Sequence, residues 1–249
     1  MRPKFLSLCF LIILTALPGA ARAQSPEQDR FIAANILAVF YHELGHAVID
    51  VEDLPIYGQE EDAADVFSIF MIDALYEEDL ARDLAFDTAQ GFLAEAEFET
   101  ETGEEEQWSG VHGPSEQRFY TSVCLFFGAN TPARASFADA LDLPEARAET
   151  CKEEYDQANH SWGRIIDELI ARGKGTSLRF DGPGLGSRAA ELLAHEVTYL
   201  NSVLQLSEPI TVVVEPCGEA NAYYYTDDRL IQFCEEFETY FEDMARWLL

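Results

Sequence analysis

Two histidines, His42 and His46, stand four residues apart around Glu43 in the stretch "YHELGHAVID". On a helix, residues four apart are separated by about 40° around the axis, so both imidazoles point the same way and can bind one ion. Glu43 lies one step round the helix, beside that ion. The arrangement predicts a site for one zinc ion, with Glu43 taking a proton from the zinc-bound water.

A hydrolytic zinc site needs a third protein ligand and one position left open for water. In "EEDAAD", Glu61 and Asp65 are also four residues apart, so on a second helix they face the same way. We expect Glu61 to bind the metal, and Asp65 to accept a hydrogen bond from the far nitrogen of a ligating histidine, His42 in our interpretation. The alternatives for the third ligand are Glu52, Asp53, Glu60 and Asp62.

Two helices must position these residues. The apolar spacing over residues 28–50 predicts a helix that carries both histidines. Pro55 and Gly58 then predict a connecting loop, and a second helix, broken or continuous, is expected over about residues 60–94. The loop lets the second helix return antiparallel to the first, which brings the acids of "EEDAAD" to the histidines.

The rest of the chain predicts an α+β fold that is mostly helical, with a small C-terminal sheet. Residues 114–172 have a helical pattern with breaks near residues 130–132 and 143–144, and another helix is expected over about 187–204. "GKGTSLRFDGPGLG" predicts a glycine-rich loop without the residue order of a phosphate-binding loop. "PITVVVEP" and "NAYYYTDDRLIQF" alternate β-branched and aromatic residues, which predicts strands joined by a hairpin.

Residues 1–23 have the pattern of an export signal. Arg2 and Lys4 give a basic start, residues 5–17 are almost wholly apolar, and Ala21-Arg22-Ala23 fits the small-x-small pattern of a cleavage site. The apolar part is too short to span a bilayer comfortably, and we expect no later segment to be transmembrane. The remaining 226 residues, 24–249, would form a single domain outside the cytoplasm, periplasmic or secreted, with two lobes divided near residues 95–110.

The chain is strongly acidic. Its net charge of −30 becomes −33 once the signal and its three basic residues are removed. Such a chain is repelled by nucleic acid and by anionic membrane surfaces, which excludes both as primary partners. The acidic run over residues 95–106 is expected to be a solvated face, the alternative being a basic partner or calcium.

Cysteine usage agrees with export. Cys9 lies in the signal, and the four other cysteines favour two disulfides among three possible pairings. We favour the pairs that are close in sequence. These are Cys124–Cys151 and Cys217–Cys234.

The motifs also carry a family resemblance. HELGH followed on a second helix by Glu-x-x-x-Asp resembles the gluzincins, the class of thermolysin and neprilysin. In that class the glutamate is the third metal ligand and the aspartate orients a ligating histidine. "YHELGHAVID…LPIYGQEEDAAD", together with "HGPSEQRFYTSVC" and "CGEANAYYY", is similar to a family of bacterial metallopeptidases. The resemblance implies a zincin-like domain that hydrolyses a peptide or protein substrate.

The resemblance also suggests substrate-contacting residues. "SGVHGPSEQ" resembles a segment of the second lobe of thermolysin and implies that His112 stabilises the oxyanion, with Arg118 and Tyr120 as further candidates. "NAYY" resembles the edge-strand segment of neprilysin, which implies that Asn221 and Ala222 bind the substrate backbone. In gluzincins this strand precedes the zinc helix, whereas here it follows. Either the chain is a circular permutant or the match is accidental.

Three functions remain open at this point. The leading hypothesis is an exported zinc peptidase with Glu43 as general base. The second is a zinc-binding but non-proteolytic envelope protein that binds peptides or a protein partner. The third is a structural export factor in which the motif is a coincidence.

Overall fold

The computed structural model describes residues 24–102, 110–182 and 186–249. The expected export signal over residues 1–23 lies outside them, and so does part of the expected lobe boundary near residues 95–110. The first helix, α1 (Pro26–Val51), follows Ser25, whose hydroxyl accepts a hydrogen bond from Gln28 N at 3.1 Å. This cap satisfies one of the backbone donors that a helix start leaves without a partner.

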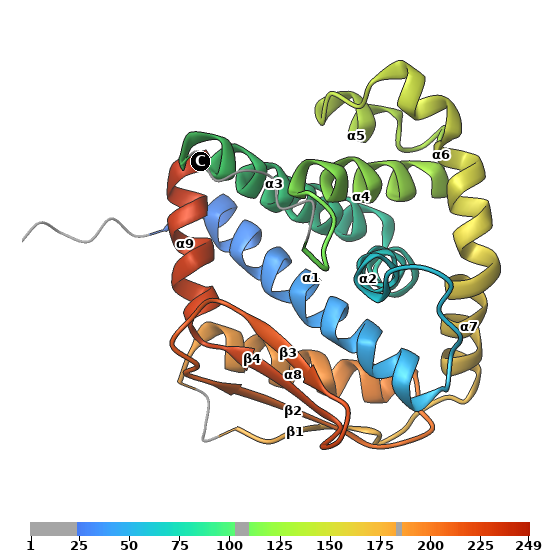
Figure 1. Ribbon diagram of the computed structural model, residues 1–249, viewed down its shortest axis with the longest axis vertical. Coiled ribbons are helices and arrows are strands. Elements are labelled where there is room, and N and C mark those ends of the chain that lie inside the picture. Colours follow the sequence, from blue (N-terminus) through green and yellow to red (C-terminus); the bar gives the residue numbers. More distant parts are fainter. Residues whose placement is uncertain (1–23, 103–109, 183–185) are drawn as a thin grey trace, which may run out of the picture.

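Helix α1 runs through the middle of the molecule (Figure 1). It packs against α2 (Glu60–Leu75), α3 (Glu78–Thr102), α8 (Arg188–Val203) and α9 (Glu236–Leu248), and also against the sheet. A helix enclosed on so many sides must be apolar almost all round, and most of its residues are buried. Elements from both ends of the chain therefore share one core.

The same composition bears on the expectation that no segment after the signal is transmembrane. α1 has the length and the hydropathy of a membrane span, with a mean hydropathy of 1.4 in its most apolar window. However, 83% of that window is buried inside the fold. Because its apolar surface is covered by protein, we interpret α1 as a core helix.

The expected second helix is broken into α2 and α3 between Leu75 and Glu78. The helical region that follows has its breaks where the sequence predicts them, near residues 130–132 and 143–144. Its elements are α4 (Ser115–Ala129), α5 (Ala135–Ala140), α6 (Glu145–Ala158), the π-helical turn η1 (Asn159–Gly163) and α7 (Arg164–Ala171). A disulfide between Cys124 and Cys151 joins α4 to α6, as predicted.

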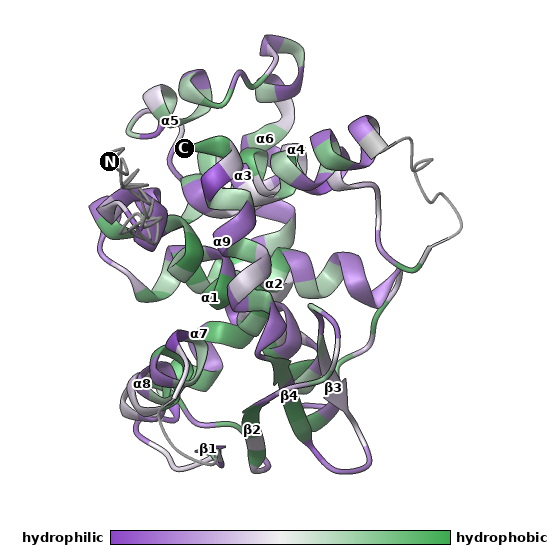
Figure 2. Cartoon of the chain, turned by 90° about the vertical axis from the view of Figure 1, so that its left-hand side faces the viewer, coloured by the Kyte–Doolittle hydropathy of each residue, from purple (hydrophilic) through white to green (hydrophobic). Residues whose placement is uncertain are grey.

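Within the described residues, the sheet has the strand order β1-β2-β4-β3. β1 (Leu178–Phe180), β2 (Ile210–Glu215) and β4 (Leu230–Cys234) are parallel, and β3 (Ala222–Tyr225) pairs with β4 in the antiparallel sense at the edge. Figure 2 shows the hydrophobic colour of β2 and β4, which lie in the centre of the sheet. The predicted hairpin is thus β3–β4, and the disulfide Cys217–Cys234 closes its base.

The fold is α+β and mainly helical with a small C-terminal sheet, as the sequence predicts. Two elements differ from expectation. Residues 178–180 form the strand β1, where the sequence predicts a loop. A strand of three residues is too short to show the alternation of apolar and polar residues that would predict it. After β4 the chain forms the helix α9, whose buried Phe241, Met244 and Ala245 pack toward α1.

Candidate active site

The site lies where α1 and α2 cross. His42 faces Asp65, and His46 faces Glu60 and Glu61, so the residue numbers rise on one helix as they fall on the other. The two helices are therefore antiparallel. On the far side of α1, the buried hydroxyl of Tyr41 donates a hydrogen bond of 2.6 Å to Glu196 of α8, which fixes α1 about its axis.

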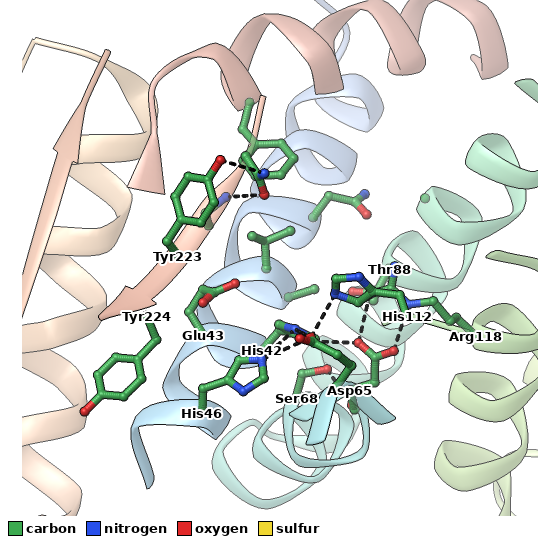
Figure 3. Close-up of a pocket in the computed structure, with 18 of the residues that line it drawn as sticks. His42, Glu43, His46, Asp65, Ser68, Thr88, His112, Arg118, Tyr223 and Tyr224 are labelled. Atoms are coloured by element: carbon green, nitrogen blue, oxygen red, sulfur yellow. Dashed lines mark hydrogen bonds and ion pairs between the residues drawn. The ribbon is translucent and has the colours of Figure 1, made fainter. Parts of the chain in front are cut away.

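Four side chains meet at one point. Glu61 Oε2 lies 3.1 Å from His42 Nε2 and 3.1 Å from His46 Nε2, and the two imidazole nitrogens are 3.2 Å apart. His112 Nε2 lies 2.9 Å from the same Glu61 oxygen. Figure 3 shows His42, His46, Asp65 and His112 gathered on one side of α1.

The donor set fits a metal ion. Zinc binds imidazole nitrogen and carboxylate oxygen at about 2.0–2.2 Å, so tetrahedral ligands are separated by about 3.3–3.5 Å. The three separations among His42, His46 and Glu61 are close to this value. His42, Glu61 and His112 form a second set of possible ligands, since their ligand atoms also lie within 4.8 Å of one another.

Carboxylates hold the outer nitrogens of both histidines. His42 Nδ1 donates to Asp65 Oδ1 at 2.7 Å, and His46 Nδ1 donates to Glu60 Oε1 at 2.8 Å. Such partners fix the tautomer and the orientation of a metal-binding imidazole. Asp65 is in turn held by Arg118, whose Nε and Nη2 bind its two oxygens at 2.7 and 2.9 Å.

The carboxylates also set the protonation of the metal-free site. Burial lowers the pKa of His42, but Asp65 and Glu61 more than offset this effect and raise it to about 9. The pKa of His46 is also raised, since the contacts with Glu61 and Glu60 outweigh its burial. His112, His42 and His46 together hold the pKa of Glu61 far below its usual range. The carboxylates thus favour the protonated forms of His42 and His46 in the metal-free site, and a bound cation would replace those protons.

Glu43 lies next to this cluster without joining it. Its side chain is buried, and Figure 3 shows it on the side of the histidines that faces Tyr223 and Tyr224 of β3. Burial raises the pKa of Glu43, an effect that the nearby His42 and His46 oppose. A carboxylate with a raised pKa beside a metal site is suited to accept and return a proton near neutral pH.

The four groups open into a cavity of about 680 Å³. One wall is β3, where residues 221–226 line the cavity. Cys234 N donates to Asn221 O at 3.0 Å, so by the alternation of an antiparallel pair the peptide groups of Ala222 and Tyr224 face away from β4. Tyr224 also donates to Asp50 at 2.6 Å, which ties β3 to the end of α1.

A known protein family matches the chain. The model of the DUF4344 family, described as "Putative metallopeptidase", matches residues 7–166, which is more than half of the chain. The chain belongs to this metallopeptidase family. None of the curated proteins and none of the solved structures matches the chain. Membership in a metallopeptidase family implies a metal, and the matched residues include His42, Glu43, His46, Glu61 and His112.

Three further residues that the sequence suggested for the site, Glu52, Arg118 and Tyr120, are not among the four side chains that meet at Glu61. Glu52, an alternative third ligand, binds Arg172 at 2.7 Å and accepts a hydrogen bond from Ser207 N, and these contacts outweigh burial and lower its pKa. Arg118 lines the cavity, but Asp65 occupies two of its nitrogens, which counts against the predicted substrate contact. Tyr120 lines a separate pocket with Pro144 and does not line the main cavity.

Sequence reasoning considered Glu60 only as a possible ligand and missed its contact with His46. Glu60 precedes Glu61 by one position, which places it about 100° round the helix. The direction of the Glu60 side chain depends on where α2 begins, and only the structure shows that α2 begins at Glu60.

Proposed function

We propose that this protein is an exported zinc peptidase of gluzincin type, with one zinc ion held by His42, His46 and Glu61. The observation that carries the proposal is the convergence of these three ligand atoms, 3.1–3.2 Å apart, in the cavity that Glu43 also lines. Membership in a metallopeptidase family supports it. Two disulfides support an oxidising compartment.

The chemistry would be the addition of water to a peptide bond. His42, His46 and Glu61 would hold a zinc ion that, when bound, would polarise the scissile carbonyl and lower the pKa of water toward neutrality. Glu43 takes a proton from the attacking water as the water oxygen bonds to the carbonyl carbon. Glu43 then returns the proton to the amide nitrogen as the carbon–nitrogen bond breaks, so an acid and an amine leave.

Two further groups would act on the substrate. His112 lies beside Glu61 with a side chain that is 46% exposed, so it can reach an oxygen that becomes negative next to the metal ligands. The Ala222 carbonyl and the peptide N–H and carbonyl of Tyr224 would pair with an extended substrate, as a strand is added to a sheet edge. Asn221 would support this edge, since its Oδ1 accepts from Ala222 N and its Nδ2 donates to Tyr223. We assign Arg118 to holding Asp65.

The position of β3 in the fold supports the interpretation that the chain is a circular permutant of the gluzincin order. β3 follows α1 in the chain, yet it lies against α1 at the edge of the sheet and lines the cavity. A chance match of "NAYY" would have no reason to fall there. We therefore include Asn221 and Ala222 in the proposed substrate-binding edge.

Zinc content and cleavage test the proposal together. We expect one zinc ion per chain in the purified protein, a large loss of zinc in His46→Ala, and cleavage within a broad peptide library. Glu43→Gln should keep the zinc and lose activity by about 10²–10⁴-fold. Zinc binding with no cleavage by the wild type would instead favour the non-proteolytic peptide-binding protein, and the absence of zinc would contradict both.

A further inference from the structure

The side of the cavity formed by α3 and α9 lies apart from the histidines and has mostly apolar walls. Helix α3 presents Thr88, Gly91, Phe92 and Glu95 to it, at the i, i+3, i+4 and i+7 spacing of one helix face. Opposite this face the walls are mostly apolar, with the amide of Asn35 against Gly91 as a polar exception. The apolar part consists of Ala38 and Val39 from α1, and Phe237 and Phe241 from α9.

Glu95 places a carboxylate among these apolar walls. Burial raises its pKa, and its hydrogen bond from Tyr240 is long, at 3.5 Å. The nearest cation in the cavity, Arg118, donates two of its nitrogens to Asp65 and stacks on Phe92 at 4.4 Å. In the described part of the chain, no lysine or arginine nitrogen lies within ion-pairing distance of Glu95. Arg118 lowers the pKa of Glu95 without making a direct ion pair with it. A shielded carboxylate whose nearest cation is already paired with Asp65 is an unfavourable arrangement that a ligand can relieve.

Thr88 is a second group that lacks a partner. It is 1% exposed, and its hydroxyl makes no hydrogen bond within the described residues. Buried hydroxyls normally have a partner, because an unmade hydrogen bond is costly. An unpaired hydroxyl on the face of α3 that lines the cavity is an independent sign that this face takes a polar ligand.

We propose that the α3–α9 side of the cavity is a side-chain subsite for lysine or arginine of a peptide substrate, with Glu95 as the residue that determines this preference. Phe92, Phe237 and Phe241 contact the methylene stem, and the cationic head reaches the Glu95 carboxylate. Aromatic rings beside the head also favour a cation over a neutral group. The inference rests on the proposed function, because it names the substrate class of that same site.

Binding tests the subsite without cleavage. The zinc-loaded Glu43→Gln protein is titrated calorimetrically with peptides that are acetylated and amidated, so that no terminus carries charge. Each peptide has lysine or its uncharged isostere norleucine at one position near the scissile bond. We expect the lysine peptide to bind at least about tenfold more tightly at one position, the effect of one charged hydrogen bond. Equal binding of the pair at every position overturns the proposal.

A second variant assigns the effect to Glu95. Adding Glu95→Gln to Glu43→Gln should remove the lysine preference and leave norleucine binding within about twofold. Glu97→Gln is the matched control, since it removes the same charge from an exposed position on the same helix. A lysine preference that survives Glu95→Gln, or that disappears equally in Glu97→Gln, contradicts a role for Glu95.

The two proposals fail in different ways. If the wild type cleaves peptides without any preference for lysine or arginine, the subsite is wrong and the peptidase stands. If lysine peptides bind preferentially but zinc-loaded wild type cleaves none of them, the peptidase is wrong and the subsite stands.

Discussion

Gly45 of α1 lies so close to Ala64 of α2 that a methyl group on Gly45 would come within 3.0 Å of the Ala64 α-carbon. The same methyl group would lie 3.2 Å from the ring of Phe67. Gly45 stands between His42 and His46 in the sequence, so the two helices approach closely beside the candidate metal site. This approach brings Glu61 to the histidines.

Gly45→Ala should therefore destabilise the protein although alanine is the better helix former. Alanine gains about 1 kcal/mol in helix propensity, whereas overpacking against backbone costs about 1–3 kcal/mol. We expect a lower melting temperature and weaker zinc binding, measured by thermal unfolding and by chelator competition. Gly58→Ala is the control, since a methyl group there meets no atom within 4 Å. Unchanged zinc affinity in Gly45→Ala would show that the helices can separate without harm to the site.

Asp65→Asn should weaken zinc binding by about 10–100-fold, the usual cost of losing the partner of a metal-binding histidine. The carboxamide cannot match the charged hydrogen bond to His42 Nδ1, and it leaves Arg118 without its counter-ion. Competition with a chelator measures the affinity. Asp62→Asn, an exposed position on the same helix, should bind zinc like the wild type. The same loss in both variants would point to general electrostatics and not to the orientation of His42.

His112→Gln separates two roles for His112. If this residue stabilises the oxyanion, zinc content should stay at one ion per chain while kcat falls by about 10²–10³-fold with little change in KM. The contact of 2.9 Å with Glu61 also allows His112 to be a ligand. In that case, His112→Gln would lose zinc as His46→Ala does. Metal analysis next to steady-state kinetics distinguishes the two outcomes.

The metal-free protein should lose stability as the pH rises from about 6.5 to about 9. The pKa of His42 is about 9 in the fold, above its ordinary value of about 6.5, so its charged form stabilises the fold fully below pH 6.5. The raised pKa of His46 acts in the same direction. Zinc affinity should rise over the same range, because the metal needs neutral imidazoles.

Thermal unfolding of chelator-treated protein between pH 6 and 9.5 measures this loss. His42→Gln should flatten the profile, whereas His195→Gln, at an exposed histidine on α8, should leave it unchanged. A flat wild-type profile would show that His42 is neutral in the metal-free fold.

The candidate metal site was the most predictable part of the molecule, because the arrangement of its residues depends on local periodicity. His42 and His46, like Glu61 and Asp65, are four apart, and any helix turns such pairs to one face. Only one further condition, an antiparallel return of α2, was needed to bring them together. The helix-breaking signals at Pro55 and Gly58 indicated that return.

Features that depend on tertiary structure could not be predicted in this way. The sequence predicts a solvated acidic face over residues 95–106, of which residues 103–106 lie outside the described part of the chain. Glu97 and Glu101 are exposed, as predicted, but Glu95 lines the cavity because it shares the face of α3 that carries Thr88. The parallel pairing of β2 with β4 joins strands that are separated in the chain by β3. The helix α9 did have a signal, since Phe237, Phe241 and Met244 recur at helical spacing after β4.

The edge position of β3 restricts what the cavity can receive. A strand edge pairs only with a chain that is itself extended over several residues and whose own backbone donors and acceptors are unused. Helices and the inner strands of a folded protein do not meet that condition. A compact native protein would therefore resist the proposed peptidase except at its linkers and frayed termini, and unfolding that substrate first would make its interior sequence accessible.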